Sequence, residues 1–308
     1  MASRVGFIGF GEVASVFSEA VSPQASAVLA YDVLVEKPAG KDLLRKRDRT
    51  NEVRFVGLPE LVAGSDWIVS TVTSDAAAAV ARSAAPYLGS ARTFLDLNAT
   101  APAVKQQIAR TIEPTGAAFV EGAILSAVGV TGARTRILIG DSRGPAATEA
   151  LGRLGLNAVF YSREIGRASA FKLLRSIFSK GLEALLIEFL VAGRRAGLED
   201  ELWREVTELF ARNPFAQVAE NWIKTHATAH ERRYHEVVQV AAEMRALGLD
   251  PVMTAATEAF FARSRTTGLK ERFAGTDATP ADVIAFLESA LRAAEPSGSP
   301  PQALKSER

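Results

Sequence analysis

Near its start the chain reads Gly6-Phe7-Ile8-Gly9-Phe10-Gly11-Glu12-Val13-Ala14, a G-x-G-x-x-A pattern between an apolar run and a helical run. Gly9 permits a tight turn there, and Gly11 lets backbone N–H groups approach a pyrophosphate at the start of the helix. Ala14 lets that helix pack closely on the sheet. The spacing therefore predicts a strand, a phosphate-binding turn and a helix, the opening unit of a dinucleotide-binding domain. The residues that we expect to contact the dinucleotide here are Gly9, Phe10, Gly11, Glu12 and Val13.

An acidic residue stands where such a domain needs one. Asp32 ends the second expected strand, about 20 residues after Gly11, where a carboxylate accepts hydrogen bonds from the ribose hydroxyls. A carboxylate would repel a 2′-phosphate, so we expect NAD rather than NADP as the cofactor. The basic run Arg45-Lys46-Arg47, with Arg49 nearby, is the opposing signal, because it could reach such a phosphate. The alternative is that this run is a solvated helix face.

The first half of the chain alternates short apolar runs with helical runs, which predicts a parallel, doubly wound sheet of the Rossmann type. Strands are expected at Arg4–Gly9, Val28–Asp32, Val53–Val56, Trp67–Val72, Thr93–Leu97, Ala118–Ile124, Thr135–Gly140 and Ala158–Tyr161. Intervening helices are expected at Asp75–Tyr87 and Pro102–Ile112, among others.

After Tyr161 the strand pattern ends, and residues 166–196 read as one long helix with an apolar stripe. Further helices are expected at Asp200–Arg212, Ala227–Leu247, Pro251–Arg265 and Pro280–Ala293, the last with Thr279 as its N-cap. We therefore expect an α/β dinucleotide-binding domain at residues 1–163 and an all-α domain for substrate and dimerisation at residues 164–294, joined by the long helix. Residues 295–308, rich in Pro, Ser, Gly and charge, are expected to form a flexible tail.

Composition excludes several classes of protein. The 308 residues include 36 basic and 35 acidic side chains, a net charge of +1 that argues against a nucleic-acid-binding protein. The chain has no cysteine, which rules out disulfides, a thiolate nucleophile and cysteine-ligated metals. No apolar run approaches the roughly 20 residues that span a bilayer. We expect a cytoplasmic protein with no membrane partner.

Three further stretches extend the pattern of the glycine turn. Thr71-Val72-Thr73-Ser74 follows the fourth expected strand, Asp96-Leu97-Asn98-Ala99-Thr100-Ala101-Pro102 follows the fifth, and Gly166-Arg167-Ala168-Ser169-Ala170-Phe171-Lys172 opens the long helix. With these stretches the chain resembles the β-hydroxyacid dehydrogenases, a family that includes 3-hydroxyisobutyrate and 6-phosphogluconate dehydrogenases. The last two stretches are similar to its D-x-S-T-x-x-P and G-x-G-x-x-x-K motifs. The helical half looks closest to a branch whose C-terminal domain has no assigned function.

The resemblance implies roles for particular residues. Thr71, Val72, Thr73 and Asn98 would line the cofactor, the last two on its nicotinamide side, although Asn98 and Ala99 replace the family's Ser-Thr pair. Lys172 matches the catalytic lysine and would exchange the hydroxyl proton as general acid and base. Ser176 takes the place of the family's usual Asn, one helical turn after the lysine. The alternative for Lys172 and Ser176 is an ordinary polar helix face.

The family's substrate loop, D-x-P-V-S-G-G, appears here as Glu121-Gly122-Ala123-Ile124-Leu125-Ser126-Ala127. Leu125 replaces the serine that would bind a substrate carboxylate, Ser126 is displaced by one position, and Ala127 replaces the second glycine. These departures put the usual 3-hydroxy-acid substrate in question. The residues expected to contact substrate are Leu125, Ser126, Ala127, Arg175, His230, Arg233 and Tyr234.

The three histidines, His226, His230 and His235, lie on one expected helix. His226 and His230 have the i, i+4 spacing of metal ligands, but no glutamate follows the first, and arginines at 232 and 233 oppose a cation. We therefore expect no metal. The alternative for His230, Arg233 and Tyr234 is a solvated, charged helix.

The expected activity is hydride transfer between nicotinamide and a small polar hydroxy acid, alcohol or carbonyl compound. Two alternatives remain open. Imine reductases share this architecture, but they usually carry Asp or Tyr where this chain has Lys172; the other alternative is an NAD(P)-binding sensor or scaffold without turnover. We also expect a homodimer formed mainly through the helical domain, because Leu182, Leu185, Leu186, Phe189 and Leu190 form a band too wide for one helix partner.

Overall fold

The computed structural model describes residues 2–294. The chain forms two compact units, Met1–Phe178 and Ser179–Arg308, and each is described by itself. The division falls inside helix α8 (Arg167–Ala196) and not at residue 163, where the sequence pattern changes. The expected tail, residues 295–308, lies outside the described residues.

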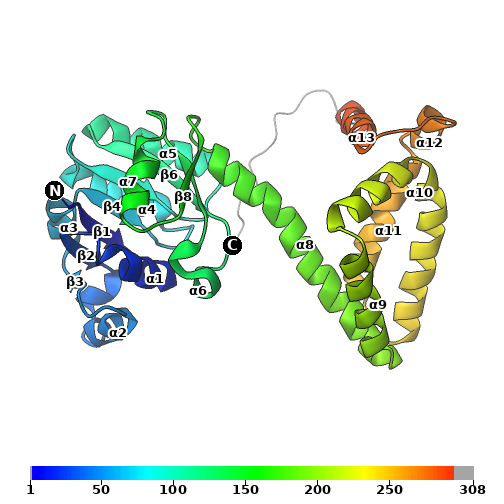
Figure 1. Cartoon of the computed structure of the whole chain (residues 1–308), viewed down its shortest axis with the longest axis horizontal. Helices are drawn as coiled ribbons and strands as arrows, with labels where there is room; N and C mark the ends of the chain where they lie inside the picture. Colours follow the sequence, from blue (N-terminus) through cyan, green and yellow to red (C-terminus); the bar gives the residue numbers. More distant parts are fainter. Residues whose placement is uncertain (1, 295–308) are drawn as a thin grey trace. The chain divides into compact units, whose positions relative to one another are not determined.

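The N-terminal unit is built on an eight-stranded sheet with the order β3-β2-β1-β4-β5-β6-β7-β8 (Figure 1). Its strands are β1 (Arg4–Ile8), β2 (Ala27–Tyr31), β3 (Arg54–Phe55), β4 (Trp67–Ser70), β5 (Thr93–Asp96), β6 (Ala118–Ile124), β7 (Ile137–Gly140) and β8 (Ala158–Ser162). The prediction of these strands is confirmed, with small shifts at their ends. The order reverses between β1 and β4, the switch point beyond whose carboxyl ends ligands bind in doubly wound sheets.

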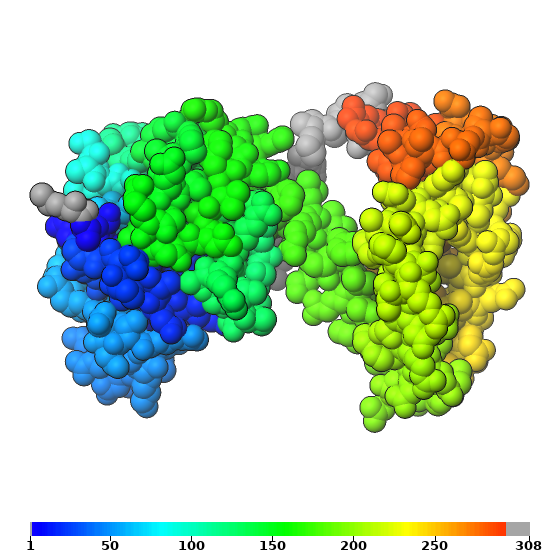
Figure 2. All heavy atoms as spheres, in the orientation of Figure 1, coloured from blue at the N-terminus to red at the C-terminus, as the bar shows by residue number. Residues whose placement is uncertain are grey.

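One strand pair departs from the parallel sheet that the sequence predicts. β6 and β7 run antiparallel, with Glu121 opposite Gly140. The connection between them holds only α6 (Val128–Thr131) and a 3-10 turn, η4 (Gly132–Arg134), so no crossover helix returns the chain for parallel pairing. The α6 turn instead packs against α1 (Glu12–Val21), and their surfaces meet in the space-filling view (Figure 2).

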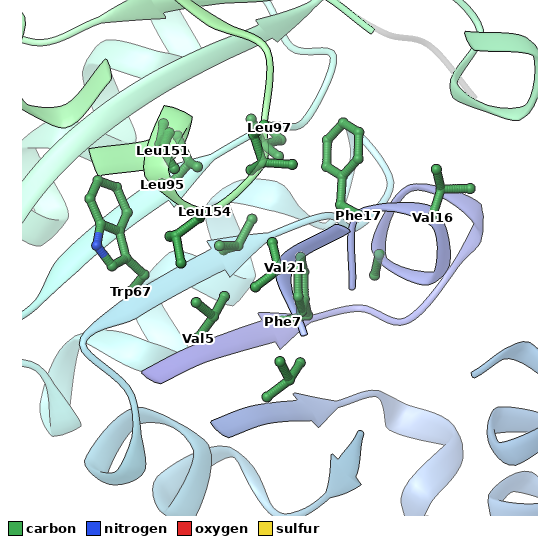
Figure 3. Packing of buried hydrophobic residues seen from close by; sticks show 14 of the residues in the cluster. Val5, Phe7, Val16, Phe17, Val21, Trp67, Leu95, Leu97, Leu151 and Leu154 are labelled. Atoms are coloured by element: carbon green, nitrogen blue, oxygen red, sulfur yellow. The ribbon is translucent and has the colours of Figure 1, made fainter. Parts of the chain in front are cut away.

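Helices cover both faces of the sheet. One core cluster joins α1 and α7 (Ala146–Arg153) to the sheet, and Figure 3 shows Phe17 and Val21 of α1 beside Val5 and Phe7 of β1. A second cluster covers the other face and includes apolar side chains of α3 (Leu58–Gly64), α4 (Ala77–Ala84) and α5 (Pro102–Ile112). The remaining short elements are η1 (Val33–Glu36), α2 (Gly40–Arg47), η2 (Ala85–Tyr87) and η3 (Glu113–Thr115).

The C-terminal unit is helical. Its elements are the second half of α8, then α9 (Glu199–Arg212), α10 (Phe215–Ala246), α11 (Val252–Arg265), α12 (Leu269–Phe273) and α13 (Pro280–Ala294). At the start of α13, the Thr279 hydroxyl accepts a hydrogen bond from the Asp282 N–H (3.2 Å), and Asp282 accepts one from the Thr279 N–H, which confirms the predicted cap. No helix within residues 2–294 is long and apolar enough to span a membrane.

The prediction for α10 was wrong at its start, because the helix begins at Phe215 rather than Ala227. The first part of α10 contains Asn221, Thr225 and His226, residues of low helix propensity. Packing compensates for this: Ile223 and Ala227 join a cluster with Leu269, Phe273, Ala278 and Val283. Tertiary contacts, which local helix propensity does not include, therefore extend the helix.

Candidate active site

The turn after β1 requires glycine at its first position. Gly9 has a φ of +83°, and its N–H donates to the Tyr31 carbonyl (2.8 Å). A Cβ on Gly9 would lie 2.7 Å from Val72 Cγ1 and 2.8 Å from the Thr71 carbonyl oxygen. A Cβ on Gly11, in contrast, would meet no atom within 4 Å, so its backbone borders open space. No side chain caps the first turn of α1, which leaves its N–H groups available to an anion.

Asp32 closes the glycine turn from the end of β2. Its Oδ2 accepts a hydrogen bond from the Phe10 N–H (2.9 Å), and its Oδ1 accepts one from the Leu34 N–H (3.0 Å). Gly9, Gly11 and Asp32 line a cavity of about 390 Å³, which we call the Asp32 cavity. Phe10 contributes only backbone to this turn, because its ring is fully buried and packs edge-on against Phe55.

A guanidinium faces the same cavity. Arg47, at the end of α2, lines the Asp32 cavity, and its Nη1 donates to the Phe10 carbonyl oxygen (3.1 Å). The Ser15 hydroxyl in turn donates to the Arg47 carbonyl oxygen. Of the basic run that the sequence singles out, Arg47 is thus fixed beside the glycine turn, while Arg45 lines a separate cavity. A carboxylate and a cation border the space where a ribose 2′ substituent would bind.

A second cavity, of about 310 Å³, shares Thr71 and Val72 with the first, and we call it the Lys172 cavity. Thr73 lines only the Asp32 cavity. The Lys172 cavity brings together expected residues from five separate stretches of the sequence. Its walls are formed by Glu12, Val13, Thr71, Val72, Leu97, Asn98, Ala99, Ile124, Ser126, Ala127, Val128 and Lys172.

Asn98 is held rigidly in the wall of the Lys172 cavity. Its backbone N–H donates to Asp96 Oδ1 (2.9 Å), and its side-chain Nδ2 donates to the Ser70 hydroxyl (2.9 Å). The remaining polar atom, Oδ1, is buried and has no hydrogen-bond partner among the described residues. A buried acceptor without a partner at a cavity wall is suited to a donor on a ligand, such as a carboxamide NH₂.

A buried ion pair lies behind this wall. Lys105, on α5, is fully buried, and its Nζ donates to Asp96 Oδ1 (2.7 Å) and to the Asp96 carbonyl oxygen (2.9 Å). Asp96 is buried as well. No role was predicted for Lys105 from the sequence. Its position was detectable, because residues 105, 108, 109 and 112 form the buried stripe of α5.

Lys172 enters its cavity from the second turn of α8. The pKa of Lys172 lies below its usual value of 10.5, chiefly because burial disfavours the charged amine and secondly because Lys105 is close. An amine with a lowered pKa can give and take a proton nearer neutral pH.

The start of α8 is anchored by Glu121 of β6. This carboxylate is fully buried, its Oε2 accepts a hydrogen bond from the Gly166 N–H (2.6 Å), and its Oε1 accepts one from the Ser169 N–H (2.7 Å). Gly140, opposite on β7, leaves room for it, since a Cβ there would lie 2.7 Å from Glu121 Oε2. The negative charge also complements the positive end of the helix. The sequence showed Glu121 within the substrate-loop motif but gave it no role.

Other expected residues near Lys172 have different surroundings. Leu125 packs beside Ala123, Leu138 and Ala168, and its carbonyl oxygen accepts a hydrogen bond from Arg175 Nη1 (2.7 Å). The Ser176 hydroxyl donates to the Lys172 carbonyl oxygen (2.9 Å). None of Leu125, Arg175 and Ser176 lines the Lys172 cavity, whereas Ser126 and Ala127 do.

His230, Arg233 and Tyr234 belong to the C-terminal unit, on α10. His230 is buried and its Nδ1 bonds the His226 carbonyl oxygen (2.9 Å), while Tyr234 lies under the Arg265 guanidinium. Arg233 and His226 line a largely apolar cavity of about 420 Å³ in that unit. Burial, with His230 and Arg233 nearby, lowers the pKa of His226 to about 4. Within residues 2–294 no group of three or more His, Asp or Glu side chains is arranged for a metal.

Comparison with known proteins finds relatives over most of the chain. A family model described as a domain of unknown function (DUF1932) matches residues 194–264. A conserved hypothetical protein from Sinorhizobium meliloti is 30% identical, with 94% of this chain and 97% of that chain covered and a TM-score of 0.58. The conserved protein MTH1747, described as structurally similar to 3-hydroxyacid dehydrogenases, is 31% identical, with 87% and 98% covered and a TM-score of 0.55.

The fold is also found in an imine reductase from Myxococcus stipitatus, solved in complex with NADP⁺. That protein is 16% identical, 92% of this chain and 99% of that chain are covered, and the TM-score is 0.73. At this identity the likeness concerns the fold alone.

Proposed function

Because this chain belongs to the β-hydroxyacid dehydrogenase-like family, we propose that it is an NAD(P)-dependent oxidoreductase whose dinucleotide binds along the Asp32 and Lys172 cavities. The observation that carries the proposal is the glycine turn. It combines a left-handed Gly9, an open backbone face at Gly11 and an uncapped α1 at the sheet's switch point. These features fit a pyrophosphate.

The residues fit the other parts of the dinucleotide as well. Asp32 would accept the ribose hydroxyls, although its oxygens also hold the turn through Phe10 and Leu34. Asn98 Oδ1, buried and without a partner in residues 2–294, would accept a carboxamide N–H. The nicotinamide, when bound, supplies or receives the hydride. We propose NAD as the preferred form because of Asp32, with Arg47 as the group that opposes this preference.

We assign to Lys172 the transfer of the proton to and from the substrate oxygen. In the direction of reduction, Lys172 Nζ gives a proton to the substrate oxygen, and in oxidation it takes the hydroxyl proton. Partial burial and Lys105 bring its pKa toward the range in which both steps are efficient. Ser126 and Asn98, in the same cavity, offer hydrogen bonds to a small polar substrate with a CH–OH or carbonyl group. Ser176 does not line the cavity. It acts through the backbone of Lys172, whose carbonyl oxygen accepts a hydrogen bond from the Ser176 hydroxyl.

The first test of this function is a calorimetric titration with NADH and NADPH, followed by an NAD(P)H-coupled absorbance screen of hydroxy acids, alcohols, carbonyl compounds and cyclic imines. Binding of either cofactor together with turnover supports an oxidoreductase. Binding without turnover on any substrate would favour a sensor or scaffold, and absence of binding would contradict the proposal.

The second test concerns Lys172. We predict that Lys172→Ala lowers kcat by roughly two to four orders of magnitude, the range of general acid–base catalysis, with an unchanged NADH dissociation constant. Lys172→Arg should lower kcat as well, because a guanidinium group keeps its proton at working pH. Lys180→Ala is the matched control, since Lys180 is an exposed lysine of the same helix. Near-normal turnover of an alcohol or carbonyl substrate in Lys172→Ala would show that another group moves the proton.

A further inference from the structure

Glu12 is the acidic group of the Lys172 cavity. It is the first residue of α1, directly after the glycine turn, and its side chain is exposed. The cavity wall contains one other ionisable residue, Lys172. Within residues 2–294, Glu12 has neither a hydrogen-bond partner nor an ion-pair partner for its carboxylate. Its negative charge is therefore available to a ligand in the cavity.

The fold makes room for this carboxylate. The α6 turn packs against α1, and Gly129 of that turn faces Glu12. A Cβ on Gly129 would collide with Glu12 Oε1. The carboxylate thus lies against the turn that also carries Val128, another residue of the cavity wall.

The other polar groups of the cavity favour a donor on the ligand. Asn98 Oδ1 is a buried acceptor, and Ser126 provides a hydroxyl. Lys172 is the cavity's one basic residue. Leu125 offers no group to a substrate carboxylate, and Arg175 donates to the Leu125 carbonyl oxygen outside the cavity wall. An anionic substrate would meet the negative charge of Glu12 in this cavity.

We propose that the substrate of this site carries a protonated nitrogen and that Glu12 selects it by pairing with that charge. This inference rests on the proposed oxidoreductase function and names the substrate class of the same cavity. A cationic nitrogen pairs with the free carboxylate and donates to Ser126 or to the second lone pair of Asn98 Oδ1, which the carboxamide leaves free, whereas a carboxylate satisfies neither Glu12 nor Asn98 Oδ1.

Two classes of reducible compound carry such a positively charged nitrogen, the protonated amino ketones and the iminium ions. In an amino ketone, hydride adds to the carbonyl carbon and the oxygen takes a proton, which Lys172 supplies. In an iminium ion, hydride adds to carbon while the electron pair of the C=N π bond moves to nitrogen, so a neutral amine forms without a proton donor. Turnover of the iminium compound should therefore survive Lys172→Ala, whereas turnover of the amino ketone should not. Both outcomes support the proposal, and they identify which compound the enzyme uses.

The binding experiment uses three probes with one ring and different charge: cyclohexylammonium, cyclohexanol and cyclohexanecarboxylate. Calorimetry measures their dissociation constants with the full-length protein saturated with cofactor. We expect the ammonium to bind the wild type most tightly and Glu12→Gln to weaken it about tenfold, the effect of a charge-assisted pair. Glu12→Asp, which keeps the charge, should retain the preference for the ammonium. Glu19→Gln is the matched control, because Glu19 lies on the same helix and lines neither cavity.

Two results would overturn the inference: a wild type that binds the carboxylate probe more tightly than the ammonium, or an unchanged ammonium affinity in Glu12→Gln. Cofactor titration of the same preparations separates this failure from failure of the proposed function. If NAD(P)H binds and a hydroxy acid turns over while Glu12→Gln has no effect, the oxidoreductase stands and only the substrate class is wrong.

Discussion

Lys105 is a positive charge close to Lys172, and its removal should change the pH at which Lys172 loses its proton. In reduction Lys172 must be protonated, so kcat falls as pH rises through its pKa. Because that pKa lies below 10.5, the fall begins at lower pH than for an exposed lysine. Lys105→Met removes the repulsion and raises the pKa, so the falling limb of the pH–kcat profile should move to higher pH.

The same substitution should destabilise the fold, because it leaves Asp96 buried without its cation. The loss expected for breaking a buried pair is about 3–5 kcal/mol of unfolding free energy, measurable by urea denaturation. Arg110→Met, at an exposed position of the same helix, is the control and should change neither property. An unmoved pH limb in folded Lys105→Met would show that burial alone sets the pKa of Lys172.

Asp32 and Arg47 give a second test, because both line the same cavity and carry opposite charges. Asp32→Asn should strengthen NADPH binding by roughly tenfold relative to NADH, since it removes a charge that repels the 2′-phosphate. Arg47→Ala should weaken NADPH binding and leave NADH within about twofold. Calorimetric titration of both cofactors decides this. Wild-type protein that binds NADPH more tightly than NADH would contradict the proposed preference and show Arg47 to be dominant.

Single-residue roles were only partly predictable from the sequence. The glycine turn and Lys172 could be found because motif spacing reflects contacts within one short segment. The burial of Lys105 against Asp96 and the hydrogen bonds from α8 to Glu121 join residues that are distant in the chain. No local pattern reports such pairings.

The junction of β6 and α8 should affect kcat, although none of its hydrogen bonds involves the reacting atoms. Glu121→Gln keeps the shape of the side chain but places an amide NH₂ against the N–H of Gly166 or Ser169. We expect a loss of about 1–3 kcal/mol in stability and a reduced kcat, because the first turn of α8, directly before Lys172, is no longer held. Cofactor affinity should stay unchanged.

The control for Glu121→Gln is Glu164→Gln, an exposed acid just before the same helix. Kinetics at saturating cofactor and calorimetry with NADH separate the effects. A proportional loss of kcat and of NADH binding in Glu121→Gln would indicate general unfolding, and normal kcat would show that α8 does not need this anchor.

The strands and helices were predicted well from the sequence, because apolar runs and helical apolar stripes mark the segments whose side chains pack in the core. It missed the direction of β7, because an apolar run has the same pattern in either direction. It also missed the first turns of α10, where packing of Ile223 and Ala227 outweighs weak local propensity.

For the whole molecule we predict a homodimer formed mainly through the helical domain. Two large apolar side chains of the predicted band on α8 are exposed in the single chain, Leu182 (40% exposed) and Leu185 (46%). Such a band is suited to an interface with a second copy. Light scattering should give about twice the chain mass of 32.8 kDa.

The variant that tests the assembly is Leu182→Glu with Leu185→Glu, which should yield monomers. Leu43→Glu, on exposed α2, is the control and should leave the mass unchanged. A wild type that is monomeric at micromolar concentration would rule out the proposed dimer.

The division of the chain inside α8 also constrains how its domains could be exchanged by recombination. A crossover at residue 163 would join β6 of one parent to the helix of another, so Glu121 and the turn that it caps would come from different ancestors. A crossover after Phe178 would leave Glu121, Lys105 and Lys172 within one inherited segment. The safest crossover point therefore lies within a helix, where a chimera must preserve helical phase, and not in the loop before it.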